Sequence, residues 1–191
     1  MTIKIFYDTE FTHLFEPGLV EDPQLISIAL LTPDAQYCYL ENQDFKPENC
    51  SYFVEDAVLP HLSCYPDEPP FTPEAIKQAL LKGGRDTMSA KALAARLRAF
   101  IEVQGDQVQL ISDAPSYDWP MLEQLFKEHG WPHNLERRAF GLGFTGNQSH
   151  IYVQESELAY EADPTLKRHH AGDDVKVIAK AYGLATRKLD V

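Results

Sequence analysis

An apolar run that ends in two closely spaced acids is the feature that most constrains the fold. Residues 3–7 have the composition of a buried β-strand, and Asp8 and Glu10 follow directly. Because successive side chains of a strand point to opposite faces, Asp8 and Glu10 are expected on the same face. Two carboxylates held this close repel each other unless a proton or a cation lies between them. The end of this strand therefore predicts a site and not only a turn.

Hydrophobic periodicity predicts how the chain continues. Two more strands are expected before residue 43, so the opening reads as an antiparallel meander. Later segments alternate between helical and strand-like patterns, which predicts an α/β fold with a mixed central sheet flanked by helices. The expected segments are strands at 3–7, 24–32, 36–42 and 107–113 and helices near 52–62, 73–81, 89–103, 117–128 and 173–182. Residues 131–167 show no clear pattern.

Glycine and proline mark several helix ends. Gly105, Gly130 and Gly183 are expected just past the ends of the helices at 89–103, 117–128 and 173–182. Pro120 is expected in the first turn of its helix, where a missing N–H costs little.

Length, charge and cysteine content limit the class of protein. With 191 residues and 44% hydrophobic residues, the chain is expected to form a single domain, 1–191. The net charge of −12 argues against a protein that coats long nucleic acid, because that mode needs a basic face. No apolar run approaches the ~20 residues that span a bilayer, and no signal-peptide pattern is present, so we expect a cytoplasmic protein. Cys38, Cys50 and Cys64 form no CxxC pair and are expected to be reduced packing residues.

Acidic residues also lie at the starts of two predicted helices, and their positions need an explanation. Asp118 lies at the start of the helix at 117–128, on the same stripe as its apolar residues. Asp173 and Asp174 open the last helix, five residues or fewer after His169 and His170. Each acid could simply complement a helix dipole, a gain of ~0.3 to 1 kcal/mol. Their joint order along the chain with the first acid pair favours a common site.

These three segments resemble the motifs of a known family. "YDTEF", "SDAPSYDWPML" and "HHAGDDVKVI" are similar to the three motifs of the DEDDh exonucleases of the RNase H-like superfamily, the last having the form His, four residues, Asp. The similarity is greatest to the small stand-alone exoribonucleases of the RNase AS type. It extends from Ile5 to about Tyr182 and implies an RNase H-like (DnaQ-like exonuclease) fold.

The resemblance implies a role for each acid. Asp8, Glu10, Asp118 and Asp174 would be the ligands of two Mg²⁺ (or Mn²⁺) ions, with Asp8 bridging, and His169 would be the general base. Magnesium prefers hard oxygen ligands, and a neutral imidazole near pH 7 can accept a proton from water, so these residue types suit the roles.

The motifs depart from the family pattern at two points. Asp113 and Ala114 stand where a His-Asn-Ala stretch is common; Asp118 is favoured over Asp113 because an aromatic residue precedes it and the helix follows. The third motif has adjacent histidines, so His170 with Asp174 is an alternative to His169 with Asp174. The spacing also requires a bend, for which Ala171 and Gly172 are the expected residues.

Residues near these motifs are candidates for substrate contacts. Thr9 and Phe11 lie beside the acid pair, where Phe11 could stack on a terminal base, and Arg168 could contact a phosphate.

The function expected is a metal-dependent 3′-to-5′ exonuclease acting on single-stranded ends, with RNA favoured and nucleoside 5′-monophosphates as products. A DNA-directed exonuclease of the same fold is the alternative, and recognition of the 2′-hydroxyl would separate the two. A non-catalytic nucleic-acid-binding module would be expected to lack one of the five site residues, and all five are present. A structural acidic domain would show no dependence on metal. The direction of attack and a homodimer are implied by the resemblance alone.

Overall fold

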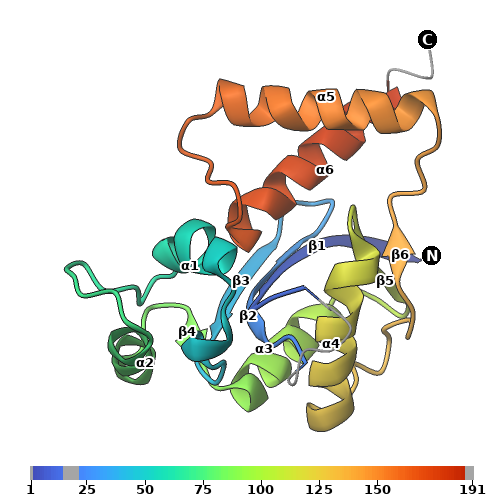
Figure 1. Cartoon of the computed structure of the whole chain (residues 1–191). Coiled ribbons are helices and arrows are strands. Elements are labelled where there is room, and N and C mark those ends of the chain that lie inside the picture. The colour runs from blue at the N-terminus through green and yellow to red at the C-terminus, as the bar shows by residue number, and fades with distance from the viewer. Residues whose placement is uncertain (1, 15–21, 188–191) are drawn as a thin grey trace.

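The fold is built on a mixed β-sheet. The computed structural model describes residues 2–14 and 22–187, and within them the sheet has six strands in the order β4-β3-β2-β1-β5-β6 (Figure 1). The strands are β1 (Ile3–Phe11), β2 (Leu25–Leu31), β3 (Tyr37–Asn42), β4 (Thr87–Met88), β5 (Val108–Ser112) and β6 (Phe140–Gly141). β1, β2 and β3 form an antiparallel meander, while β5 runs parallel to β1 and β6 parallel to β5. The predicted meander and mixed sheet are therefore confirmed.

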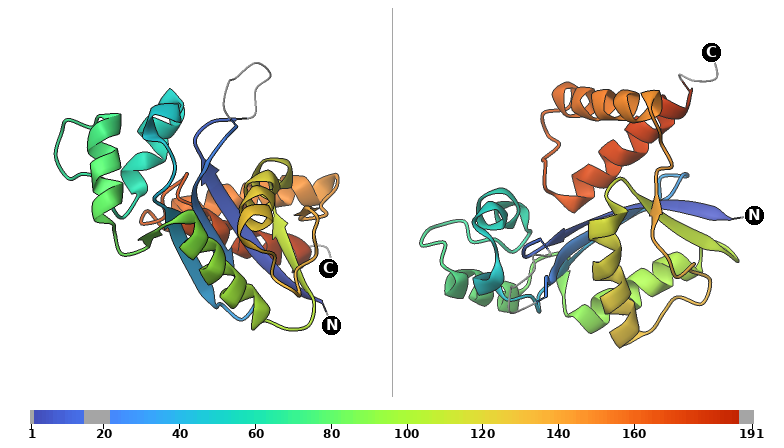
Figure 2. Two further views of the ribbon diagram at one scale, coloured as in Figure 1. Left: turned by 90° about the horizontal axis from the view of Figure 1, so that it is seen from below. Right: turned by 45° about the vertical axis from the view of Figure 1, so that its right-hand side comes forward.

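Helices cover both faces of this sheet. α3 (Ala90–Glu102) and α4 (Pro115–His129) pack on one face, and α6 (Ala171–Arg187) packs across β1, β2 and β3 on the other. α5 (Asn147–Ala162) lies outside α6 and does not form part of the layer next to the sheet (Figure 1). α1 (Tyr52–Ala57) and α2 (Pro73–Lys82), with short 3₁₀ turns at Pro47–Asn49 and Leu59–His61, pack beyond one end of the sheet (Figure 2).

The alternation of β1 decides where its acids point. Ile5 and Tyr7 are fully buried in the cluster that includes α3 and α4, whereas Phe6 packs with Ala29 and Val175 on the α6 side. Asp8 and Glu10 follow Phe6 at steps of two, so they lie on the face that α6 covers.

Three predictions about element ends and cysteines have clear outcomes. α6 continues through Gly183 to Arg187, so the predicted helix end was wrong: a Cβ at Gly183 would contact nothing within 4 Å, and the residue sits in an ordinary helical turn. α4 begins at Pro115, which places Pro120 inside the helix and not in its first turn. Cys38, Cys50 and Cys64 are free and packed against apolar residues, as predicted.

Periodicity failed to predict β4, β6 and α5. The two strands are two residues long, too short to show a period of two. α5 has a weak apolar stripe because it packs on only one helix and buries only Glu155 and Ala159. None of the described helices has both the length and the apolar character needed to cross a lipid bilayer.

Gly172 packs the first turn of α6 tightly against β3. A Cβ built there would lie 2.9 Å from His170 Cε1 and 3.2 Å from Tyr39 Cδ2, and would also meet the Tyr37 hydroxyl. We predict that Gly172→Ala lowers the free energy of unfolding by about 1 to 3 kcal/mol, because overpacking outweighs the gain in helix propensity. Gly183→Ala in the same helix is the control and should stabilise by up to about 1 kcal/mol. Urea denaturation measures both; equal effects of the two substitutions would show that the contact with β3 is not tight.

Candidate active site

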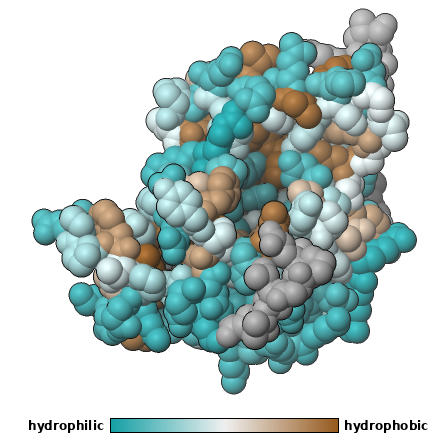
Figure 3. All heavy atoms as spheres, in the orientation of Figure 1, coloured by the Kyte–Doolittle hydropathy of each residue, from teal (hydrophilic) through white to brown (hydrophobic). Residues whose placement is uncertain are grey.

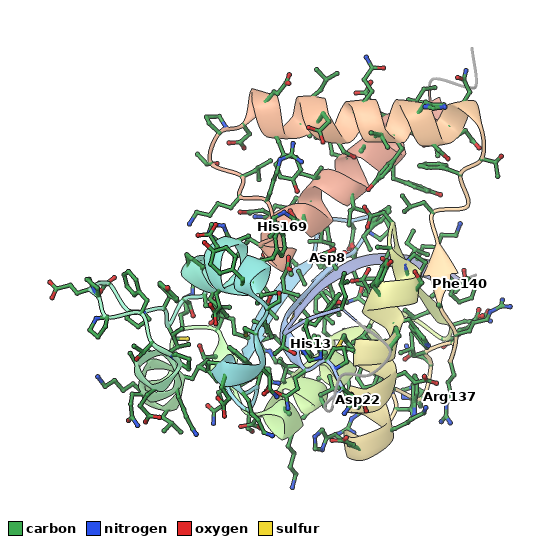
Figure 4. The ribbon with its side chains drawn as sticks, viewed as in Figure 1. Asp8, His13, Asp22, Arg137, Phe140 and His169 are labelled. Atoms are coloured by element: carbon green, nitrogen blue, oxygen red, sulfur yellow. The ribbon has the colours of Figure 1, made fainter. Side chains whose placement is uncertain are left out.

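The predicted site residues come together where β1 ends. Asp8 and Glu10 leave β1, while Asp118 lies in the first turn of α4 and Asp174 in the first turn of α6. Figure 4 shows Asp8 on β1 and His169 at the start of α6 on the same side of the sheet. Their ligand atoms form two groups, in each of which the atoms lie within 4.8 Å of one another. The groups are Glu10, His169 and Asp174, and Asp8, Asp113 and Asp118.

Asp118 is held by two hydroxyl donors. Thr9 Oγ1 donates to Asp118 Oδ1 at 2.7 Å, and Ser112 Oγ donates to Asp118 Oδ2. Ser112 also accepts the Ala114 N–H at 2.9 Å, which joins the end of β5 to the start of α4. Asp118 is only 2% exposed, so its carboxylate has a defined orientation while each oxygen keeps a lone pair free.

Asp174 is held in the same manner by donors from two other segments. The Tyr160 hydroxyl of α5 donates to Asp174 Oδ1, and the His169 backbone N–H donates to Asp174 Oδ2 at 3.0 Å. The two predicted ligands on helices are therefore positioned before any cation binds.

His169 has the backbone conformation that turns the chain into the site. Its φ is +61°, in the left-handed region, whereas Ala171 and Gly172 already belong to α6. The predicted bend is thus present, but it lies at His169 itself and not at the two small residues. The His169 ring meets the edge of Phe53 from α1 with centroids 4.9 Å apart. Burial, and the charge of Arg168, lower the pKa of His169, which favours a neutral imidazole near pH 7.

His170 occupies a different environment. Its ring packs on Tyr39 with centroids 4.6 Å apart, and its Nδ1 lies 3.3 Å from Asp173 Oδ2. It lines a cavity of about 860 Å³ on the β3 side, together with Glu41 and Arg96. The structure thus groups His169, and not His170, with Asp174.

Asp8 and Glu10 contrast with the two helix acids because they have no donors. Neither carboxylate accepts a hydrogen bond or forms an ion pair with a residue in the ranges 2–14 and 22–187. Burial, and then the charges of Asp118, Glu10 and Asp174, raise the pKa of Asp8 well above its ordinary value. The pKa of Glu10 is raised well above its ordinary value by burial and by Asp174 and Asp118.

The helix acids experience the same crowding. Burial raises the pKa of Asp118 and of Asp174 to about 6 each, although their hydrogen bonds oppose the shift. Four carboxylates in a partly buried space are therefore difficult to ionise together without added positive charge.

The residues present fit hard divalent cations. The two groups offer carboxylate oxygens and one imidazole, a donor set that suits Mg²⁺ or Mn²⁺ better than a thiolate-seeking metal. Carboxylates that have neither hydrogen-bond donors nor basic partners among the described residues indicate a place for a cation.

A smaller cavity reaches three of the acids, Asp8, Asp113 and Asp174. It has a volume of about 260 Å³. Its lining includes Asp8 of β1, Asp113 from the β5–α4 junction, Tyr152 and Tyr160 of α5, Arg168 just before α6, and Asp174 of α6. On the face seen in Figure 1, the surface is hollowed between the α5–α6 layer and the elements below it (Figure 3).

The three candidate substrate contacts differ in accessibility. Thr9 is 4% exposed, and its hydroxyl is engaged with Asp118. Phe11 packs against the main core. Arg168 lies at the cavity wall, over the Tyr160 ring at 4.2 Å and paired with Glu157. Their roles in substrate binding stay predictions.

The donors that orient the acids were not predicted from the sequence. Ser112 could have been noticed, since it is the first residue of the second motif and ends β5. Tyr152 and Tyr160 could not, because α5 itself was not predicted. Asp113 was treated as an alternative to Asp118, whereas the structure places both in one group.

Comparison with known proteins identifies the fold. No family model and no curated protein sequence matches the chain. Among solved structures, an exonuclease I with bound product has a TM-score of 0.51 at 14% identity, over 98% of this chain and 43% of that one. The exonuclease I of Methylocaldum szegediense has a TM-score of 0.53 at 11% identity, over 98% and 41%. The chain thus spans about two-fifths of the length of these exonuclease I chains.

Two shorter proteins match over most of their length. A full-length 3′-exonuclease has a TM-score of 0.52 at 14% identity, over 98% of this chain and 82% of that one. S. pombe Pop2p, in a form with Mg²⁺ and Mn²⁺ bound, has a TM-score of 0.53 at 13% identity, over 98% and 84%. At such identities the likeness concerns the fold alone. The chain has the predicted RNase H-like (DnaQ-like exonuclease) fold, and these structures do not distinguish the RNase AS type within it.

Asp8→Asn tests the cost of the unpaired acid. The pKa of Asp8 is higher in the folded protein than in the unfolded chain. The free energy of unfolding therefore falls as the pH rises above about 4, because the folded protein resists the ionisation of Asp8. We predict that Asp8→Asn raises the free energy of unfolding of chelator-treated protein by about 1 kcal/mol or more at pH 7.5, with little effect at pH 4. Asp106→Asn, an exposed acid in the turn before β5, is the control for net charge. If Asp8→Asn instead lowers the free energy of unfolding at pH 7.5, repulsion between Asp8 and the neighbouring acids does not destabilise the chelator-treated protein.

Proposed function

We propose that residues 1–191 form a single metal-dependent exonuclease domain that removes nucleotides from the 3′ end of single-stranded nucleic acid, with RNA preferred. The observation that carries the proposal is the pair of donor-free carboxylates, Asp8 and Glu10, between two acids that are already oriented. The exonucleases among the structural neighbours support it, and so does the Pop2p form with Mg²⁺ and Mn²⁺ bound.

Asp8, Glu10, Asp118 and Asp174 would hold two Mg²⁺ or Mn²⁺ ions, with Asp8 between them. Bound in this way, divalent cations would supply positive charge against the charge that builds on a phosphodiester during in-line displacement. The protein contributes the fixed orientation of Asp118 and Asp174 and the partly buried position of Asp8 and Glu10.

His169 would accept the proton of the attacking water. As the water oxygen bonds to phosphorus, the bond from phosphorus to the 3′ oxygen of the preceding nucleotide breaks. The 3′ oxygen takes a proton from solvent water, and the terminal nucleotide leaves as a 5′-monophosphate. His169 suits this role because it lies beside Glu10 and Asp174 and because its lowered pKa keeps the imidazole neutral. Its exposed position leaves the ring accessible to substrate.

The remaining elements of the proposal concern the substrate. Arg168, at the wall of the cavity, would contact a phosphate, and Thr9 and Phe11 would lie near the terminal nucleotide. The preference for RNA and a homodimer follow from the resemblance of the three motifs to small exoribonucleases, and they stay predictions.

Cation binding should stabilise the fold. We predict that millimolar MgCl₂ raises the melting temperature of the chelator-treated protein, because the cation binds the folded acids and not the unfolded chain. Protons compete for the same carboxylates, whose pKa values of about 6 at Asp118 and Asp174 predict a larger shift at pH 8 than at pH 5. Differential scanning fluorimetry measures the shift. A melting temperature that does not respond to Mg²⁺ at either pH would refute the cation site.

Nuclease activity is tested directly on labelled oligomers. We predict that 5′-labelled single-stranded RNA is shortened in steps in the presence of Mg²⁺, and that Asp8→Asn and His169→Ala each lower the rate at least about 100-fold. Both variants should keep the wild-type circular dichroism spectrum. His150→Ala, an exposed histidine of α5, is the matched control and should keep the wild-type rate.

The same assay separates the alternatives. Faster shortening of the matched DNA oligomer would make the protein a DNA-directed exonuclease of the same fold. Intact oligomers of both kinds, from a protein whose melting temperature responds to Mg²⁺, would favour a non-catalytic binding module.

A further inference from the structure

Asp113 is a fifth acid at the site, beside the four that the family resemblance implies as metal ligands. It follows Ser112 directly, between β5 and α4, and is exposed. One of its carboxylate oxygens lies within 4.8 Å of ligand atoms of Asp8 and Asp118. Three carboxylates thus approach one point on the α4 side of the site, whereas Glu10, His169 and Asp174 meet on the α6 side.

Tyr152 fixes the orientation of Asp113. Its hydroxyl, on α5, donates to Asp113 Oδ2 at 2.9 Å across 39 positions of sequence, and the Tyr152 ring packs on Phe144. Burial raises the pKa of Tyr152, so the phenol stays protonated and remains a donor. The bond occupies one oxygen and leaves Asp113 Oδ1 free, the same pattern of partial engagement that Tyr160 produces at Asp174.

No basic side chain neutralises this group. Within residues 2–14 and 22–187, Asp113 forms no ion pair, and Arg168, the arginine that lines the same cavity, pairs with Glu157. Three carboxylates without a basic partner among residues 2–14 and 22–187 therefore approach one location.

We propose that Asp113 is a direct ligand of the divalent cation on the Asp8–Asp118 side, held ready by Tyr152. This inference rests on the proposed function and assigns a further ligand to the same centre. A hydrated cation there would neutralise the three carboxylates. With three carboxylates, this side binds its cation without help from a substrate phosphate.

Manganese titration of the full chain tests the assignment. Isothermal calorimetry with MnCl₂ alone, without nucleic acid, should give two sites in the wild-type protein. Asp113→Ala should weaken one of them at least about 10-fold and leave the other unchanged. Tyr152→Phe, which removes only the donor oxygen, should weaken the same site by a smaller factor. Asp106→Ala carries the same change in net charge and should leave both sites unchanged.

The dependence on salt concentration distinguishes direct coordination of the cation by Asp113 from long-range electrostatic attraction. The effect of an exposed charge that acts only through solvent shrinks when KCl is raised from about 0.1 M to about 0.5 M, whereas the loss of a ligand persists. If the effect of Asp113→Ala on Mn²⁺ affinity disappears at the higher salt, the assignment is overturned. It is also overturned if Asp113→Ala and Tyr152→Phe both bind two Mn²⁺ ions with the affinities of the wild-type protein.

The outcomes also distinguish this inference from the proposed function. If the wild-type protein shortens RNA and Asp113→Ala binds two Mn²⁺ ions as the wild type does, the inference fails and the function stands. If the wild-type protein binds no Mn²⁺, both fail.

Discussion

Electrostatic repulsion among the acids at the end of β1 is the constraint on which the rest of the site depends. The pairing of β1 with β2 and β5 fixes Asp8 and Glu10 on one face, and α6 covers that face, so the two carboxylates can neither separate nor become fully solvated. Within residues 2–14 and 22–187, hydroxyl and amide groups donate to Asp118 and Asp174, but no donor reaches Asp8 or Glu10. The fold thus maintains a charge that only protons or cations can balance.

The architecture places this charge by joining segments that are distant in sequence. β1 supplies the central acids, the β5–α4 junction supplies Asp113 and Asp118, and the start of α6 supplies His169 and Asp174. α5 then contributes Tyr152 and Tyr160, one to each of the two groups of side chains. A helix outside the sheet layers therefore helps to order the site, which explains why its inward side carries tyrosines although its buried apolar surface is small.

The parts of the site that depend on local chemistry were predictable from the sequence. The alternation of a strand places Asp8 with Glu10, and the position of Asp118 at a helix start follows from the apolar stripe of α4. The parts that depend on tertiary packing were not. No feature of the sequence around Tyr160 indicates its hydrogen bond to Asp174. The bend predicted at Ala171 and Gly172, from their small size, lies instead at His169, whose backbone is left-handed.

The most direct test of the account is the location of bound cations. Anomalous diffraction from crystals of the full chain grown with MnCl₂ would show each Mn²⁺ ion independently of any assumption about activity. The account predicts peaks in direct contact with Asp8, with Glu10 and Asp174 on one side and Asp118 on the other. Well-ordered crystals in saturating MnCl₂ with no peak within bonding distance of Asp8 or Glu10 would contradict it.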